Sequence, residues 1–145
     1  MFRSIDFRKH ILGVLAIFGL LVWISNAGNN SANVAPKYHV KDVSAADAKA
    51  LIDGGALVVD VRGKDQFAAG HIPGAISAPL SELEKGIPSA LEGAQVKSIV
   101  VNCADGVTTG PEGTAILNKA GYANAVNLKP GFDGWKSAGY PVARK

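Results

Sequence analysis

The sequence predicts an α/β domain with a mostly parallel sheet flanked by helices. Two short apolar, β-branched runs, residues 57–61 (LVVDV) and 98–102 (SIVVN), have the length and composition of buried strands. Between and after them lie helical stretches that begin at capping residues and end at glycines. Short strands that alternate with helices are typical of a parallel sheet covered by helices.

The first half of the domain contains three expected helices and two expected strands. Ser44 and Asp47 can each bond a free amide of a first helical turn, and Gly54 stops that helix. Ser81 with Glu84 repeats the capping pattern, which predicts another helix start near residue 82. The expected elements are helices over 45–52, over 66–69 up to Gly70 and from 82 onward, and strands over 57–61 and around 75–76.

The second half repeats this order of strand and helix. The segment Thr109-Gly110-Pro111-Glu112 has the pattern of a capping box with proline just inside the helix, and Gly121 marks the end of that helix. The expected elements are strands over 98–102 and 125–128, a helix over about 110–119 and one helical turn over 133–137.

Length and composition limit the chain to one domain of the ordinary globular kind. The chain has 145 residues, of which 48% are hydrophobic and 19% are charged. Its formal charge is +3, but Arg3, Arg8 and Lys9 stand near the N-terminus with only Asp6 against them. Without residues 1–27 the chain keeps 12 basic and 11 acidic side chains, so we predict no nucleic-acid binding.

Residues 1–27 have the pattern of an export signal. Three basic side chains precede an unbroken run of fourteen apolar or glycine residues, 11–24 (ILGVLAIFGLLVWI). That length suits the core of a signal peptide better than a bilayer span of about 20 residues. Small residues, Ser25 and Ala27, occupy the positions that a cleavage site favours. An uncleaved membrane anchor, in contact with the membrane through residues 11–27, is the alternative.

Both alternatives place the rest of the chain outside the cytoplasm. In a Gram-negative bacterium this means the periplasm, with the domain either soluble after cleavage or tethered to the cytoplasmic membrane. Residues 28–37 (GNNSANVAPK) are small and polar without periodicity, which predicts a flexible linker. The predicted domain therefore comprises residues 38–145.

Cys103 is the only cysteine of the chain and stands at the carboxyl end of the strand 98–102. Ligands of parallel sheets bind at such strand ends. The loop from Cys103 to Thr108 precedes a helix start, so its amides can stabilise a thiolate, and Gly106 permits the necessary turn. A buried, inert cysteine is the alternative, and the loop by itself leaves both open. One cysteine and three scattered histidines predict no metal site.

Several motifs in the right order resemble the rhodanese (sulfurtransferase) family, over about residues 38–143. The matching segments are Asp60-Val61-Arg62 with Phe67, 70–75 (GHIPGA), 103–108 (CADGVT), 128–135 (LKPGFDGW) and 139–141 (GYP). The order of the blocks makes the resemblance more specific than any single block. It implies a three-layer rhodanese-like α/β domain, preceded here by the N-terminal hydrophobic segment.

The resemblance implies that Cys103 is a nucleophile. It would take a sulfane sulfur from a donor such as thiosulfate, carry it as a persulfide, and pass it to a thiophilic acceptor such as cyanide or a thiol. Asp60, Arg62 and His71 would support the structure, with Asp65 as a candidate partner for Arg62. No metal or organic cofactor is implied. The residues expected to bind the persulfide are Ala104, Asp105, Gly106, Val107 and Thr108.

The loop departs from the family pattern in its charge. It has no arginine or lysine between Cys103 and Glu112, and Asp105 adds a negative charge, which argues against strong activity on anionic thiosulfate. The missing arginine also argues against a phosphatase or arsenate reductase of this fold. A second hypothesis is therefore a weak or inactive rhodanese-like module that binds a protein partner at the membrane. The presence of Cys103 and Gly106 favours sulfur transfer with a small substrate: thiosulfate, polysulfide or a thiol.

Overall fold

The computed structural model describes residues 37–145 of the chain. The segment predicted to be a signal peptide or membrane anchor, and all but the last residue of the predicted linker, lie outside the described residues. Within residues 37–145, no helix has both the length and the apolar composition that crossing a membrane requires. Residues 37–145 form one compact unit.

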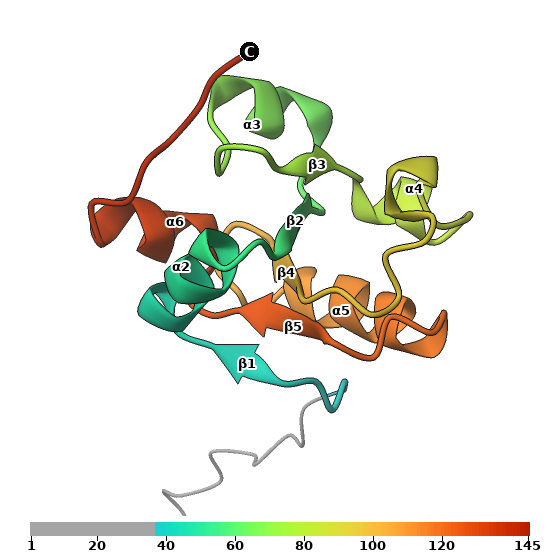
Figure 1. The fold of residues 1–145 in the computed structure, drawn as a ribbon. Helices are drawn as coiled ribbons and strands as arrows, with labels where there is room; N and C mark the ends of the chain where they lie inside the picture. Colours follow the sequence, from blue (N-terminus) through green and yellow to red (C-terminus); the bar gives the residue numbers. More distant parts are fainter. Residues whose placement is uncertain (1–36) are drawn as a thin grey trace, which may run out of the picture. The chain divides into compact units, whose positions relative to one another are not determined.

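The sheet is entirely parallel, as Figure 1 shows at the centre of the domain. Its order is β1-β5-β4-β2-β3, so β4, the strand before Cys103, lies in the middle. Val59 of β2 stands opposite Val101 of β4, which in turn stands opposite Asn127 of β5. The strands are β1 (Asp42–Val43), β2 (Leu57–Asp60), β3 (Ile76–Ser77), β4 (Ile99–Asn102) and β5 (Ala125–Leu128).

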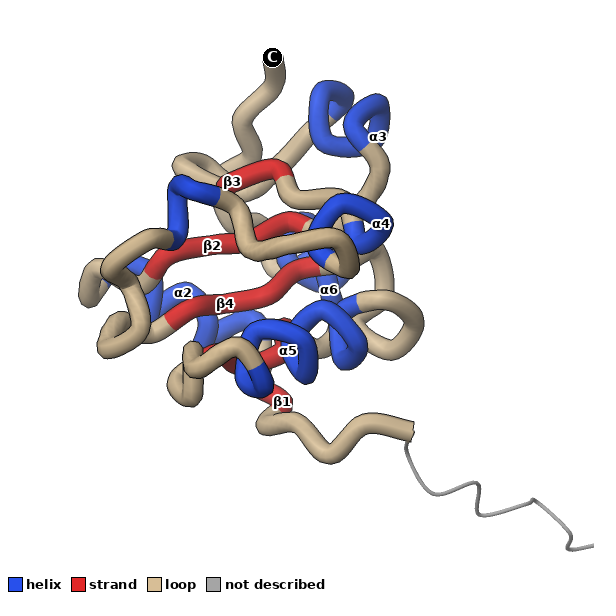
Figure 2. Tube along the Cα trace, turned by 90° about the vertical axis from the view of Figure 1, so that its right-hand side faces the viewer, coloured by secondary structure: helices blue, strands red, loops and turns tan. Residues whose placement is uncertain are grey.

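Helices cover both faces of this sheet and give the domain three layers. Figure 2 looks onto the sheet from the side of α4 and α5, with α2 and α6 behind the strands. The helix α3 lies near β3, at one edge of the sheet (Figure 1). The helices are α2 (Ala45–Asp53), α3 (Lys64–Ala69), α4 (Leu80–Leu83), α5 (Gly110–Lys119) and α6 (Gly131–Ser137), with a 3-10 turn at Ser89–Leu91.

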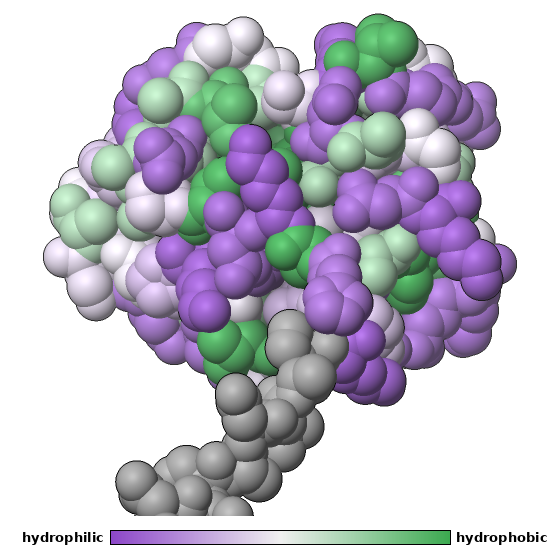
Figure 3. Space-filling view, turned by 90° about the horizontal axis from the view of Figure 1, so that it is seen from below, coloured by the Kyte–Doolittle hydropathy of each residue, from purple (hydrophilic) through white to green (hydrophobic). Residues whose placement is uncertain are grey.

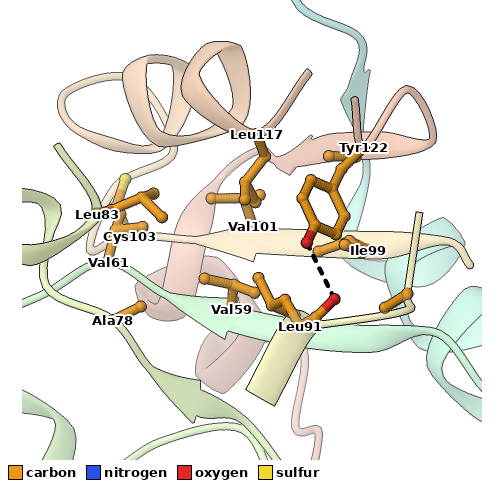
Figure 4. Packing of buried hydrophobic residues seen from close by; sticks show 12 residues of the cluster. Val59, Val61, Ala78, Leu83, Leu91, Ile99, Val101, Cys103, Leu117 and Tyr122 are labelled. Atoms are coloured by element: carbon orange, nitrogen blue, oxygen red, sulfur yellow. Dashed lines mark hydrogen bonds between the residues drawn. The ribbon is translucent and has the colours of Figure 1, made fainter. Parts of the chain in front are cut away.

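Alternate strand residues point to opposite faces and build two hydrophobic clusters. On one face, Val59 and Val101 pack with Leu83 of α4 and Leu117 of α5. Val58 and Val100 face the other way, into a cluster that includes the residues Ala48, Phe132 and Trp135 of α2 and α6. Cys103 continues the alternation of β4 and points to the α4–α5 face (Figure 4).

Most of the expected elements are confirmed within two residues at each end. Ser44 caps α2, where its side chain accepts from the Asp47 amide at 3.1 Å. The structure also contains β1, which the sequence analysis did not predict. It is two residues long and forms only through pairing with β5, so no local sequence pattern predicts it.

Two details of the expected helix starts are wrong, namely where α4 begins and how α5 is capped. The helix α4 begins at Leu80 rather than near residue 82, because Pro79 fixes the entry into it and Ser81 already lies inside. At α5, Thr109 stands at the N-cap position without a side-chain hydrogen bond, because its backbone is already helical. The capping box predicted over residues 109–112 is therefore absent, although the helix begins where it was expected.

The surface is of the ordinary polar kind. Figure 3 views the domain from below and shows hydrophilic side chains with apolar ones scattered among them. Among the described residues, the exposed large apolar side chains are Val96, Val107 and Val142. They are far apart in the sequence, and only Val107 belongs to the loop that follows Cys103.

Candidate functional site

Cys103 follows β4 directly, at the carboxyl end of the central strand. Its side chain is fully buried and belongs to the same hydrophobic cluster as Val61 and Leu83 (Figure 4). Parallel strands bring their carboxyl ends to one edge of the sheet, which is where ligands of such sheets bind. The only thiol of the chain thus lies at the edge where ligands of such sheets bind.

The loop after Cys103 turns one amide directly onto the sulfur. The Gly106 N–H donates to Cys103 Sγ at 3.1 Å. Gly106 has a φ of 75°, a left-handed conformation that other residues adopt at a cost. A Cβ there would lie 2.5 Å from the Leu128 carbonyl oxygen, so the loop approaches the end of β5 closely. The site therefore requires glycine at this position for two independent reasons.

Two further hydrogen bonds tie the loop to the start of α6. The Phe132 N–H donates to the Cys103 carbonyl at 2.8 Å, and the Asp133 N–H donates to the Ala104 carbonyl at 3.0 Å. Both acceptors lie on the first two residues of the loop. The backbone of Cys103 is consequently held independently of the contacts of its sulfur.

Asp105 takes two of the amides that were expected to hold a persulfide. Its Oδ1 accepts from the Val107 N–H at 2.9 Å, and from the Thr108 N–H and hydroxyl at 3.0 Å and 2.9 Å. The same oxygen lies 3.5 Å from Cys103 Sγ, which can donate its proton to it. An ionised carboxylate two and three residues before these amides is a stronger acceptor than a neutral thiol. Thus Gly106 bonds the sulfur, while Val107 and Thr108 bond Asp105.

These bonds keep the Asp105 carboxylate ionised. The Val107 amide is the main cause, and with the Thr108 amide and hydroxyl and the Cys103 thiol it lowers the pKa of Asp105 from 3.8 to about 2. Hydrogen bonds to the charged form favour that form. The loop therefore holds a permanent negative charge beside the sulfur at neutral pH.

The lowered pKa predicts how Asp105 contributes to stability as pH changes. Its folded pKa lies below the unfolded value, so its contribution is complete above the unfolded pKa and is lost as pH falls through about 2. We expect the difference in the free energy of unfolding between wild type and Asp105→Ala to be constant above about pH 5 and to shrink toward pH 2. Urea denaturation over this range measures it. A difference that does not change with pH would contradict the ionised-carboxylate assignment.

Arg62 pairs with Asp60 and not with Asp65, which corrects the expected partner. The guanidinium donates to Asp60 through Nε at 3.0 Å and through Nη2 at 2.6 Å. Asp60 is fully buried at the end of β2, and a buried carboxylate needs a paired charge. Asp65 lies exposed in the first turn of α3 and can be hydrated instead.

The Asp60–Arg62 pair connects three segments around the site. Arg62 Nη2 donates to the Gly70 carbonyl at 2.8 Å, and the guanidinium stacks 4.0 Å from the centre of the Phe132 ring. Asp60 also accepts from Asn102, the residue before Cys103, at 3.1 Å. Removing either partner would leave an unpaired charge inside the domain.

His71 has contacts typical of a structural histidine. Its Nδ1 lies 2.9 Å from the Phe67 carbonyl oxygen, and its ring stacks on the Phe67 ring with a centroid distance of 3.9 Å. Its backbone pairs with Ala143 in an isolated antiparallel bridge. These contacts fix the segment after α3 to the C-terminus of the chain.

Sequence reasoning missed Asn127, which is buried beside the loop. It lies in β5, and its Nδ2 donates to the Gly106 carbonyl at 2.8 Å. The available signal was a single amide side chain in the apolar run 125–128. A polar side chain in a buried strand must find hydrogen-bond partners, so it marks a position with a specific neighbour.

One cleft borders the loop at the carboxyl edge of the sheet. It has a volume of about 360 Å³, and its lining includes Ala104, Phe132, the cationic side chains Arg62, Lys136 and Arg144, and the acidic side chain Asp133. A larger cavity of about 700 Å³ lies elsewhere, lined by Lys41, Gly55 and Ser98 among others. The smaller cleft alone of these two is lined by a residue of the Cys103 loop, Ala104, while neither is lined by Cys103, whose side chain points to the α4–α5 face. No cluster among residues 37–145 has the three ligating side chains that would hold a metal ion.

The comparisons with known proteins agree with this arrangement. A model of the rhodanese-like domain family matches residues 44–138. The uncharacterized protein YibN of Escherichia coli strain K12 is 35% identical over 106 residues, which are 72% of this chain and 73% of that protein. The thiosulfate sulfurtransferase GlpE of Pseudomonas fluorescens is 33% identical over 102 residues, covering 70% of this chain and 89% of GlpE.

The solved structures that resemble this chain include a single-domain sulfurtransferase. The human single-domain sulfurtransferase superposes with a TM-score of 0.58 at 29% identity, over 68% of this chain and 97% of the human chain. The family match includes Cys103, the loop after it and the Asp60–Arg62 pair.

Proposed function

The chain belongs to the rhodanese-like domain family, and on this premise we propose that it is a sulfane-sulfur carrier that works through a persulfide on Cys103. The observation that carries the proposal is the Gly106 N–H donated to Cys103 Sγ at 3.1 Å. A fixed backbone dipole at this position favours a negatively charged sulfur, and a thiolate is the nucleophilic form of cysteine.

The proposed reaction has two steps. In the first, the Cys103 thiolate attacks the outer sulfur of the donor; with thiosulfate, the S–S bond breaks, sulfite leaves with the electron pair, and a Cys103 persulfide forms. In the second, an acceptor such as cyanide attacks the outer persulfide sulfur, thiocyanate leaves, and the thiolate returns. The charge is the same on both sides of each step. Two steps through a covalent intermediate give ping-pong kinetics.

The Gly106 amide is placed to support both negatively charged states of the sulfur. It already bonds Sγ before any donor binds, so it does not need to reorganise when the proton leaves. The backbone bonds from Phe132 and Asp133 hold the first two loop residues in place during the exchange. No metal or cofactor takes part in these steps.

Asp105 is proposed to disfavour donors with a high negative charge. Its carboxylate lies 3.5 Å from the sulfur, and thiosulfate brings two negative charges to that place. The Asp105→Asn variant keeps the acceptor oxygen and removes the charge, so we expect kcat/KM for thiosulfate to rise about tenfold, roughly 1.4 kcal/mol at the effective dielectric of a surface loop. Asp105→Arg should raise it further.

Steady-state rates of thiocyanate formation measure this effect. The matched control is Asp65→Asn, which removes the same charge from α3, outside the loop. Unchanged or lower thiosulfate use in both Asp105 variants would refute the electrostatic argument. An equal gain in the Asp65 variant would assign the effect to the net charge of the domain instead.

The proposed function is tested by two-substrate kinetics of the full-length chain, with thiosulfate or polysulfide as donor and cyanide as acceptor. We expect double-reciprocal plots with parallel lines, because the donor leaves its product before the acceptor reacts. Intersecting lines would contradict a persulfide carrier. Absence of turnover with both donors would favour a second candidate function, a rhodanese-like module that binds a protein partner.

That second candidate is a rhodanese-like module that binds a protein partner and has little or no activity of its own. Two observations favour it. The amides of Val107 and Thr108 already donate to Asp105, and the side chain of Cys103 is fully buried. This candidate does not explain the amide that Gly106 directs at the sulfur, so we rank sulfur transfer first.

A further inference from the structure

Asn127 connects the strand β5 to the loop of Cys103. It is fully buried in β5, and its Nδ2 donates two hydrogen bonds, to the Gly106 carbonyl at 2.8 Å and to Asp42 Oδ1 at 2.7 Å. Both partners are acceptors, so the amide must face them with its nitrogen. Asp42 belongs to the edge strand β1, which means that the bonds join the loop to two strands.

The bond to Gly106 sets the direction of the loop amides. A trans peptide points its carbonyl and the following N–H to opposite sides. The Gly106 carbonyl points to Asn127, so the Val107 N–H points into the loop, where Asp105 accepts it at 2.9 Å. The Gly106 N–H, one peptide earlier, is the donor to the sulfur. A rotation of Gly106 away from Asn127 would displace both of these donors.

The same side chain touches the helix start beside the sulfur. A Cβ on Gly110 would overlap Asn127 Oδ1 and would lie 3.0 Å from Cys103 Sγ. The amide oxygen and the sulfur therefore face the same small space against α5. Asn127 Oδ1 has no hydrogen-bond partner among the described residues. A buried polar atom without a partner is costly, so this position is not explained by stability of the fold alone.

We propose that Asn127 is a positioning residue for sulfur transfer at Cys103. It holds the Gly106 carbonyl, and through it directs the Gly106 and Val107 N–H groups into the loop. Asp42 is the outer anchor that orients the Asn127 amide. The inference rests on the proposed function, because it assigns to Asn127 the geometry on which persulfide formation depends.

The first test compares Asn127→Ala with Asn118→Ala in the full-length chain. Asn118 is the matched control, because its Nδ2 also donates two hydrogen bonds, to the Tyr122 carbonyl at 2.9 Å and to the Ala125 carbonyl at 3.1 Å, away from the loop. The readouts are the rate constant of sulfur loading by polysulfide, followed by intact mass, and the hydrogen exchange of the amides in residues 104–108.

We expect Asn127→Ala to lower the maximal loading rate by about tenfold or more, with little change in the half-saturating donor concentration. Exchange of the loop amides should become faster. Asn118→Ala should change neither readout, whatever it does to the stability of the fold. Equal loading rates in wild type and Asn127→Ala would overturn the inference and leave the proposed function intact.

The second test uses residues at the surface, where a substitution is tolerated. Asp42→Ala removes the anchor of Asn127, and it also removes the ion pair with Lys129, whose Nζ lies 3.4 Å from Asp42 Oδ2. Lys129→Ala removes the ion pair alone. We expect a loading rate about threefold lower in Asp42→Ala and no change in Lys129→Ala, as an exposed ion pair contributes little.

The outcomes separate the inference from the proposed function. Slower loading in Asn127→Ala and Asp42→Ala, without an effect in their controls, supports a positioning role. Equal effects in the two control variants would reduce Asn127 to a structural residue. A wild-type chain that takes up no sulfur would overturn both the proposed function and the inference that rests on it.

Discussion

Replacement of Cys103 by serine is expected to reduce thiocyanate formation to the uncatalysed rate with every donor. Cys103 is the only cysteine of the chain, so no second thiol can accept the sulfur. A serine hydroxyl does not ionise near neutral pH and forms no persulfide, which removes both steps of the reaction. The measurement is the rate of thiocyanate formation in the full-length chain, with polysulfide and with thiosulfate.

The fold should survive this change. Serine is close to cysteine in size, and its hydroxyl can donate to Asp105 Oδ1 as the thiol does. Urea denaturation of both proteins provides the control, with an expected loss of no more than about 1–2 kcal/mol for the smaller and more polar buried group. Transfer activity at the wild-type level in a folded Cys103→Ser protein would refute the mechanism.

Gly106→Ala is expected to be the most destabilising of the loop substitutions, at about 3 kcal/mol or more. The residue has a φ of 75°, which costs a side chain about 1 kcal/mol by itself. The new Cβ would also lie 2.5 Å from the Leu128 carbonyl oxygen and 2.8 Å from both the Gly131 nitrogen and the Lys129 Cα. These are backbone atoms of the segment that runs from the end of β5 to the start of α6, so they cannot move aside as a flexible side chain can.

Gly74→Ala is the matched control for this prediction. Gly74 has a φ of 78°, but a Cβ there would meet no heavy atom within 4 Å. It should therefore show the conformational cost alone, about 1 kcal/mol, without loss of sulfur transfer. The free energy of unfolding from urea denaturation measures both variants. Equal losses at the two positions would show that close packing of the loop against β5 contributes nothing.

The parts of the fold that the sequence predicts are those with a local cause. The runs of β-branched residues around Val59 and Val101 are long enough to identify central strands by themselves. Glycines such as Gly54 and Gly121 mark helix ends through their own low helix propensity, so their effect does not depend on what the helix packs against. By contrast, β1 exists because Asp42 and Val43 pair with β5, some 85 residues later, and a two-residue strand carries no periodicity.

In the site, too, only the features with a local cause were predictable from the sequence. The positions of Cys103 and Gly106 could be predicted, because they follow from the end of a strand and a turn within a few residues. The sequence-based expectation that Arg62 pairs with Asp65 is wrong, since Asp60 and Asp65 are both near in the chain and only burial distinguishes them. The role of Asn127 depends on a contact with Gly106 across 21 residues.

Asp105 was predictable only in part. Its negative charge was evident from the sequence, and so was its conflict with an anionic donor. Its position was not evident, because the amides of Val107 and Thr108 could have faced the sulfur just as well. In the folded loop, both amides donate to the ionised carboxylate of Asp105 instead. Which acceptor they bond depends on the three-dimensional course of the turn.

The most direct test of the account is the intact mass of the full-length chain before and after exposure to polysulfide or thiosulfate, beside Cys103→Ser. The account predicts a gain of one sulfur atom in the wild-type chain, reversed by cyanide and absent from the variant. An unchanged mass with both donors, in a chain whose thiol is shown to be reduced, would contradict a Cys103 persulfide. A gain that persists in Cys103→Ser would contradict it equally.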